Sequence, residues 1–402
     1  MAYNSFVSAV SVATFESTEA WTGGSGAADT TFFTQGTQSW RLGSAGTFNS
    51  STLTPGSPYD LSTIGQYIEI DVHVEDITKL EGVSVIAEKD VTGSNYARFD
   101  VVAADLIDGW NRVYFNKADM TLAGTFVASN WSSIARLRVG VDSLPAQTTY
   151  CSFDDWQIHK HKPHVLIEFD DGLITVYSEA MAIVESYGFY LGAFLLSTSL
   201  QNSGNYELWA NLRLMQDRGH VIGFHYHADA DYSDNTLAEI RADMDAGKLA
   251  MANEGLDNSH YGSSQGKVDE DIDQAQRERF YTGRRDAYPQ DFGDHDLPLT
   301  DLYTIWGHMI VNATSLPTFQ GWVDTLIAQE RGTCFVWHNL DPVADPTNGV
   351  SAAMFDSQIS YLSTKVAGGL LDVITRNDLA VGAPETATLV VSNERMDDAQ
   401  VM

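Results

Sequence analysis

Basic side chains are scarce in this chain of 402 residues: 23 Lys and Arg stand against 54 Asp and Glu, a formal net charge of −31. So acidic a surface argues against nucleic-acid binding, because phosphate contacts need clustered Lys and Arg. It also disfavours attachment to anionic membranes. An excess of acid suits a protein that works at high salt, where self-repulsion is screened. We therefore expect no nucleic-acid partner and a halophilic setting.

Cysteine and long apolar runs are also lacking. Cys151 and Cys334 are the only cysteines, and we expect them in different domains, which argues against a disulfide framework. No run approaches the roughly 20 apolar residues of a transmembrane helix, so we expect no membrane insertion. The first residues, 1–5, contain no basic residue and lead into no long apolar stretch, so the sequence predicts no signal peptide.

What is present indicates a multidomain globular protein, since 44% of the residues are hydrophobic and 402 residues exceed one ordinary core. Residues 1–158 read as all-β: Ile68 and Ile70 alternate with Glu69 and Asp71, the period of a half-buried strand. Short strands with turn-rich gaps predict an antiparallel sandwich. Residues 159–163 read as a polar linker, 164–385 as an α/β domain, and 386–402 as a C-terminal tail with one strand-like piece.

Two pieces of the first domain, 108–115 and 152–158, resemble late strands of jelly-roll carbohydrate-binding modules. The resemblance implies an N-terminal jelly roll that binds sugar. Tryptophan side chains are candidates for stacking on sugar rings, although packing in the core is the alternative we favour for each one. These candidates are Trp21, Trp40, Trp110, Trp131 and Trp156.

From residue 164 onward, strands alternate with amphipathic helices, which predicts a parallel sheet or barrel with its functional loops at the carboxyl ends of the strands. Three predicted strands end in residues that carry chemistry. The first, 165–169, ends in Asp170 and Asp171; the second, 220–224, ends in His225; the third, 333–337, ends in His338. Carboxylates with imidazoles are a common ligand set for Zn²⁺ and related divalent ions.

These motifs, in this order, resemble the polysaccharide deacetylase family, the NodB-homology domain of carbohydrate esterase family 4. The resemblance implies a distorted (β/α) barrel and metal-dependent removal of acetyl groups from a polysaccharide. It implies that Asp170 is the general base, that Asp171 and His225 bind the metal, most often Zn²⁺, and that His338 is the general acid.

The sequence departs from the family at two motifs. Four residues after His225 stands Asp229 where the family has a histidine, so either His227 or Asp229 is the third metal ligand, and we favour His227. The family's Arg-x-Pro-Tyr-Gly motif is reduced to residues 258–262, where Tyr261 keeps the backbone N–H expected of an oxyanion hole. Arg284 or Arg285 is the candidate to replace the missing arginine at the substrate.

Two functions follow from these patterns. The first is a metal-dependent hydrolase that deacetylates a cell-surface or extracellular polysaccharide, with the sandwich as its sugar-binding module. The alternative is a glycan-binding or adhesion protein that keeps the fold without turnover, because folds persist when chemistry is lost. Either function requires an extracellular or virion-associated location, and a viral tail or spike protein, assembled as a homo-oligomer, would reach it without an export signal.

Overall fold

The structure, a computed structural model, describes residues 5–200, 204–228, 231–285, 293–297, 299 and 301–380. They form two compact units, one of residues 6–161 and one that begins at Lys162. The predicted tail at 386–402, with its strand-like piece, lies outside the described residues. No helix in the described ranges is long and apolar enough to cross a membrane. Cys151 and Cys334 are both buried and free.

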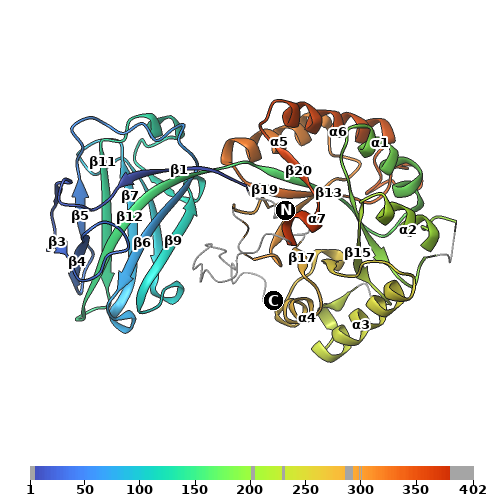
Figure 1. The fold of residues 1–402 in the computed structure, drawn as a ribbon, viewed down its shortest axis with the longest axis horizontal. Helices are drawn as coiled ribbons and strands as arrows, with labels where there is room; N and C mark the ends of the chain where they lie inside the picture. Colours follow the sequence, from blue (N-terminus) through green and yellow to red (C-terminus); the bar gives the residue numbers. More distant parts are fainter. Residues whose placement is uncertain are drawn as a thin grey trace. The chain divides into compact units, whose positions relative to one another are not determined.

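The first unit contains two antiparallel sheets (Figure 1), as the strand pattern predicts. The first sheet has the order β3-β4-β12-β6-β9, with β1 paired to β12. Its strands are β1 (Phe6–Ala13), β3 (Ala27–Asp29), β4 (Ser39–Ala45), β6 (Tyr67–Val74), β9 (Gly109–Asn116) and β12 (Thr148–His161). The second sheet has the order β10-β8-β7-β11-β5-β2. Its strands are β2 (Trp21–Thr22), β5 (Asn49–Leu53), β7 (Leu80–Glu88), β8 (Tyr96–Val102), β10 (Thr121–Ala123) and β11 (Arg136–Ser143).

Strand β6 confirms the alternating pattern but is buried on both faces. Ile68 and Ile70 join the core between the sheets, while Asp71 and His73 on the opposite face are only 4% and 9% exposed. Neighbouring side chains cover that second face: Arg112 binds Asp71, and the ring of Phe32 stacks on His73. The sequence pattern gives the period of a strand, but it cannot show what covers its polar side.

The segment predicted as a linker at 159–163 is largely a continuation of strand β12, which runs to His161 and pairs with β1. Only Lys162 and Pro163 separate it from the next strand. The histidines here are not solvated, since His161 is 3% and His164 is 1% exposed. Burial in this ladder lowers the pKa of His161 to about 4. The polar residues 159–161 form a strand because they pair with β1.

The second unit is a parallel barrel of β13 to β19, closed because β13 pairs with both β14 and β19. This confirms the predicted distorted (β/α) barrel. Strand β20 pairs with the first residues of β13, and β14 pairs with its last two. The strands are β13 (His164–Phe169), β14 (Gly192–Leu196), β15 (Val221–Tyr226), β16 (His260–Gly262), β17 (Thr282–Arg285), β18 (Ile305–Met309), β19 (Gly332–Trp337) and β20 (Asp372–Ile374).

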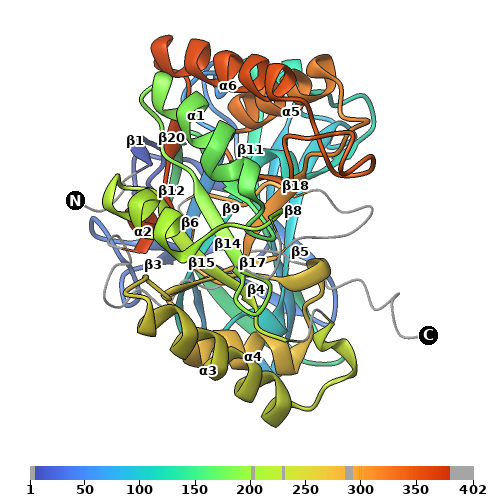
Figure 2. The same ribbon diagram turned by 90° about the vertical axis from the view of Figure 1, so that its right-hand side faces the viewer.

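Helices surround these strands, with α5 and α6 on one side and α3 and α4 on the opposite side (Figures 1 and 2). They are α1 (Met181–Ser186), α2 (Trp209–Asp217), α3 (Leu237–Asn253), α4 (Glu270–Arg279), α5 (Leu316–Gln329), α6 (Ala352–Ala367) and α7 (Arg376–Ala380). A π-helical turn, Val176–Ala180, precedes α1. Apolar stripes bury one side of these helices, and a capping box of Thr236 and Glu239 begins α3.

Alternate residues of β13 serve different parts of this core. Ile167 and Phe169 pack in the large cluster with the helices, whereas Leu166 packs in a smaller one with Cys334 and Val336. Because side chains alternate along a strand, Glu168 and then Asp170 follow on the side of Leu166. The same alternation along β19 places His338 on the side of Cys334 and Val336. The side chains of β13 and β19 that face the smaller cluster are thus followed, at the ends of the strands, by Asp170 and His338.

Candidate active site

Asp170, His225 and His338 come together at the carboxyl ends of three barrel strands. Phe169 pairs with Trp337, and the N–H of Asp170 donates to the carbonyl of Trp337 at 2.9 Å, so Asp170 and His338 emerge at the same level. The Nε2 atom of His225 lies 3.9 Å from Oδ2 of Asp170. The structure therefore assembles the predicted base, acid and histidine ligand in one place.

Asp171 occupies the turn that follows β13, with a backbone φ of 72°, and Gly172 follows with φ 61°. A left-handed conformation is uncommon for a residue other than glycine, although aspartate tolerates it better than most. The turn leaves the Asp171 side chain one-third exposed, with Oδ1 3.8 Å from Nε2 of His225. The sharp turn thus aims two successive carboxylates at one imidazole.

A hydrogen bond fixes the orientation of the His225 ring. Its Nδ1 lies 2.8 Å from the carbonyl oxygen of Gly262, and a carbonyl can only accept, so Nδ1 carries the proton. Nε2 then presents its lone pair toward Asp170 and Asp171. This is the arrangement found in metal-binding histidines, where an outer hydrogen bond fixes the tautomer.

The Asp170 carboxylate is buried and held by Arg284. It is 2% exposed, and its Oδ2 accepts from Nη2 of Arg284 at 2.5 Å. Burial opposes ionisation, but the guanidinium of Arg284, aided by His225 and His338, outweighs it and holds the pKa of Asp170 below its usual value. Its other oxygen, Oδ1, is buried without a hydrogen-bond partner among the described residues. Asp170 is thus ionised at neutral pH with one oxygen available to take a proton.

Arg284 belongs to a buried group of two acids and two arginines. Its Nη1 donates to Oε2 of Glu168 at 2.7 Å, and Arg376 donates to both carboxylate oxygens of Glu168, at 2.5 and 2.9 Å. All four side chains are at most 3% exposed. The two arginines hold the pKa of Glu168 below its usual value against the opposing effect of burial. The group is neutral as a whole, which is how buried charges are tolerated.

This geometry corrects the prediction that Arg284 contacts substrate or an oxyanion. Its guanidinium is fully buried and engaged by two carboxylates, so it supplies charge to Asp170 instead. Glu168 and Arg376 were missed from the sequence. Glu168 could have been identified from its place within the apolar run 165–169. An acid in a buried strand needs a cationic partner, so its presence there predicts a buried ion pair.

Tyr261 is fully buried, and its ring packs in a cluster with Phe224 and Phe280, whose centroids are 6.2 and 5.3 Å away. The side chain therefore serves the core, and only its main chain can serve the reaction, as predicted. Strand β16 pairs with β15 at Phe224, which places that main chain beside the strand that carries His225. The oxyanion role of the Tyr261 N–H stays a prediction.

Asp171 and His225 fit as two ligands of a divalent ion. Zinc binds nitrogen and oxygen ligands at about 2.0–2.2 Å, so two ligands of one ion lie up to about 4 Å apart. The 3.8 Å between Asp171 Oδ1 and His225 Nε2 is within this limit and too long for a hydrogen bond. The lone pair of Nε2 faces the same point.

The third ligand is not placed by the structure. The Nδ1 atom of His227 lies 2.8 Å from the hydroxyl oxygen of Ser197, and its backbone N–H donates to Asp243 at 2.9 Å. A register shift near the end of β15 breaks the alternation on which the choice of His227 rested. Across the described ranges, no three His, Cys, Asp or Glu side chains are grouped to hold a metal. Asp229 lies outside those ranges, so the choice between the two stays open.

The tryptophans proposed to stack on sugars are mostly core residues. Trp21, Trp131 and Trp156 are 5%, 8% and 0% exposed and belong to the cluster between the two sheets, so the packing alternative is confirmed for them. Trp40 is partly buried against that cluster. Trp110, on β9, is partly exposed, and its ring makes a T-shaped contact with that of His73, with centroids 5.3 Å apart.

Comparison with known proteins supports the resemblance read from the motifs. A family model described as polysaccharide deacetylase matches residues 157–282. The matched segment contains Asp170, Asp171, His225 and Tyr261 and stops before Arg284. None of the curated proteins compared with the chain matches it.

Several solved structures are similar to the chain at low identity. One is the Xyl-CE4 domain of a multidomain xylanase from the hindgut metagenome of Trinervitermes trinervoides, with 16% identity, 54% of this chain and 89% of that chain covered, and a TM-score of 0.38. A family 4 carbohydrate esterase from Streptomyces lividans in complex with acetate has 13% identity, coverages of 55% and 98%, and a TM-score of 0.34. A family 4 acetyl xylan esterase from Clostridium thermocellum in complex with a cobalt ion has 15% identity, coverages of 55% and 93%, and a TM-score of 0.37.

The family match and the barrel agree on the second unit. The match runs from before β13 to the start of β17. It contains Asp170 and Asp171, which follow β13, and His225 of β15. The remaining strands close the ring and contribute His338 and Arg284. Residues 157–282 therefore carry the sequence pattern of a polysaccharide deacetylase domain.

Proposed function

We propose that the barrel is a metal-dependent hydrolase that removes acetyl groups from a polysaccharide. The observation that carries the proposal is the meeting of Asp170, Asp171, His225 and His338 at one mouth of the barrel. The first three lie in the segment 157–282, which matches the polysaccharide deacetylase model. A base, an acid and two metal ligands are the groups that hydrolysis of an acetyl ester or amide requires.

Each residue has a step that its position supports. Asp170, held ionised by Arg284, takes a proton from the attacking water on its free Oδ1. His338, on the neighbouring strand, donates a proton to the departing amine or alcohol, and its Nδ1 is buried with no hydrogen-bond partner among the described residues. The N–H of Tyr261 stabilises the oxygen that becomes negatively charged.

A divalent ion would be held by Asp171 and His225, with His227 or Asp229 as third ligand. When bound, such an ion polarises the acetyl carbonyl and lowers the pKa of its bound water. The nitrogen and oxygen ligands suit Zn²⁺ and also other first-row ions. The identity of the metal is therefore a question for direct binding measurements.

The test is acetate release from acetylated xylan and from N-acetylated chitooligosaccharide at high salt, with Zn²⁺ and after chelation. Asp170→Asn should abolish release while the variant still folds cooperatively, although its unfolding midpoint should fall because Arg284 loses a buried partner. Asp301→Asn is the matched control, because it removes a carboxylate from an outlying ion pair with Arg277. Activity that survives in Asp170→Asn would refute the assigned base.

Metal binding should be measured separately from activity. In equilibrium dialysis, His225→Ala should lose Zn²⁺ binding, and comparison of His227→Ala with Asp229→Ala should identify the third ligand. Full Zn²⁺ retention in His225→Ala would contradict the proposed site.

A second function is favoured by one observation, namely that the sequence departs from the family at the second and third motifs, where Asp229 stands in place of a histidine and the arginine is missing. Under it, the chain binds acetylated glycan without turnover and serves adhesion. Glycan binding with no acetate release under any metal would support this alternative. Either function acts outside the cell, and we propose an extracellular or virion setting. Absence of the chain from purified particles, together with its presence in host cytoplasm, would refute the virion setting.

A further inference from the structure

A row of side chains crosses the outer face of the first sheet in the N-terminal unit. Arg41 of β4 pairs with Ala27 of β3 on one side and with Ser152 of β12 on the other. Ser152 pairs with His73 of β6, which pairs with Trp110 of β9. Directly paired residues share a face of a sheet, so Arg41 and His73 flank the small side chain of Ser152, and Ala27 lies beyond Arg41 on the edge strand. The small residues leave a hollow.

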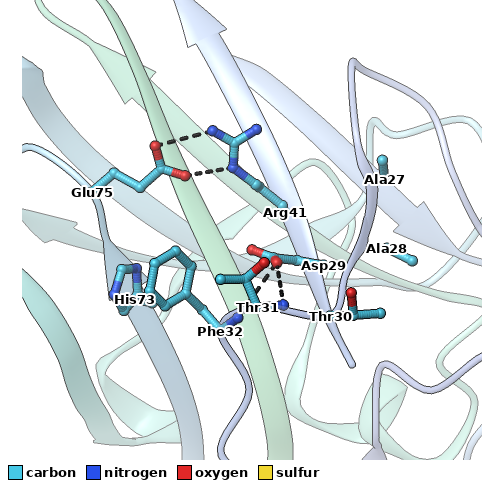
Figure 3. A pocket seen from close by; sticks show the side chains of 9 residues that line it. All are labelled: Ala27, Ala28, Asp29, Thr30, Thr31, Phe32, Arg41, His73 and Glu75. Carbon is cyan, nitrogen blue, oxygen red and sulfur yellow. Dashed lines mark hydrogen bonds and ion pairs between the residues drawn. The ribbon is translucent and has the colours of Figure 1, made fainter. Parts of the chain in front are cut away.

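The hollow is a cavity of about 700 Å³, open to solvent and lined by residues 27–32, Arg41, His73 and Glu75 (Figure 3). One wall is aromatic: the Phe32 ring, 37% exposed, stacks on His73 with centroids 4.0 Å apart. The opposite wall is an ion pair, in which Arg41 donates to both oxygens of Glu75 at 2.5 and 3.0 Å.

The cavity walls are held in place from behind. The Asp29 carboxylate accepts from the N–H of Thr31 at 2.8 Å and from the Ser152 hydroxyl at 2.9 Å, which fixes the loop that presents Phe32. Arg41 lies over the ring of Tyr150, with its guanidinium carbon 3.7 Å from the centroid. A site whose side chains are already ordered binds a ligand at a lower entropic cost.

One polar group in this wall lacks a protein partner. His73 is 9% exposed, and its Nδ1 is buried with no hydrogen bond among the described residues. Buried polar atoms are nearly always paired, so this Nδ1 has a hydrogen-bonding capacity that a water molecule or a ligand hydroxyl can fill. Burial lowers the pKa of His73, so its ring is neutral at neutral pH. It can therefore bond an uncharged group.

The charges of the cavity select the class of ligand. Arg41 and Glu75 neutralise each other, and Asp29 leaves the lining acidic, as is the whole chain. Phosphates and other anions are thereby disfavoured. A hexose or pentose ring offers a face of C–H groups for Phe32 and neighbouring hydroxyls that match the paired donors and acceptors of Arg41 and Glu75.

We infer that this cavity binds an uncharged sugar residue of a polysaccharide, with Phe32 as the stacking platform and Arg41, Glu75 and His73 as the hydrogen-bonding groups. The choice of polysaccharide rests on the proposed function of the barrel; the cavity itself does not. None of the buried tryptophans takes part. The site lies entirely within the sandwich, so it can bind glycan whether or not the barrel turns it over.

The experiment measures binding of the full chain, in the inactive Asp170→Asn background, to chitohexaose, xylohexaose and cellohexaose by calorimetry at high salt. Phe32→Ala should weaken binding of the preferred sugar at least about tenfold, since an aromatic contact contributes about that factor. Phe33→Ala is the matched control, because Phe33 is 40% exposed and does not line the cavity. Arg41→Met should weaken binding similarly.

Acetate release from a small soluble acetylated substrate, measured without the Asp170→Asn change, should be equal in wild type and Phe32→Ala. Binding lost in Phe32→Ala and kept in Phe33→Ala supports the cavity, even if acetate is never released. Equal binding in both variants, or binding of none of the three oligosaccharides, overturns it. Absence of acetate release with Phe32-dependent binding intact would instead overturn the proposed function of the barrel.

Discussion

Replacement of Arg284 by methionine tests the buried group most directly. The change keeps an unbranched side chain in the barrel and removes the guanidinium shared by Glu168 and Asp170. Glu168 keeps Arg376, but Asp170 loses the one arginine that it contacts among the described residues. Because both carboxylates are buried, Asp170 must then stay charged without its partner or take up a proton.

The expected loss of stability is about 3–5 kcal/mol, the usual result of removing one partner of a buried ion pair. The pKa of Asp170 should rise, because burial raises it and Arg284 is the largest opposing influence. The pH below which acetate release fails should therefore move upward. A double variant with Asp170→Asn should be destabilised by less than the sum of the single changes, since no uncompensated charge remains.

Urea unfolding at neutral pH and the pH–rate profile of acetate release are the assays. Arg285→Met is the matched control: the adjacent arginine is 16% exposed and binds Asp273 at 3.1 Å near the surface. It should cost no more than about 1 kcal/mol. Equal effects of the two substitutions, or a pH profile unmoved in Arg284→Met, would refute the reasoning.

Three further predictions concern stability alone, each read from urea unfolding. Burial lowers the pKa of His164 to about 3 from 6.5, so the unfolded chain binds more protons below pH 6.5. Stability that is complete above pH 6.5 should then fall by about 1.4 kcal/mol per pH unit as the pH drops toward 3, and an unchanged midpoint between pH 7 and 5 would contradict this. Gly332→Ala should cost about 1–3 kcal/mol, because its Cβ would lie 2.6 Å from Nε2 of His164 and would overlap His295; full stability would show that the two rings can move aside. Thr236→Ala should cost about 1 kcal/mol by removing the capping box of α3, whereas Thr325→Ala, in the middle of α5, should cost less.

The barrel and the strand-end residues were predictable because their signals are local. An apolar run followed by Asp170 and Asp171 shows a strand and its end, and periodicity shows the helices. The prediction that Asp170 and His338 follow the ends of two parallel strands placed them at the same mouth of the barrel. The position of the His227 side chain could not be predicted from the sequence. A register shift at the end of β15 breaks the alternation of side chains that the prediction assumed.

Long-range pairing accounts for most of what was missed. Nothing near Glu168 in the sequence indicates that its partners are Arg284 and Arg376. The polar linker became a strand because β1, some 150 residues earlier, pairs with it. Likewise, the period of β6 does not show that Phe32, from a distant loop, and Trp110, from β9, cover His73.

The partners of Glu168 have a consequence for how the chain must fold. Its two arginines follow it by 116 and 208 residues, and the β19 neighbour of its strand also comes late in the sequence. During synthesis, the segment of β13 therefore carries Glu168 in an apolar run before either arginine has been made. A charge so placed discourages premature association of that strand with other chains. We expect the barrel to close late and slowly, because its first strand depends on its last. Glu168 therefore orders the site in the folded protein and also reduces aggregation of its strand before the barrel closes.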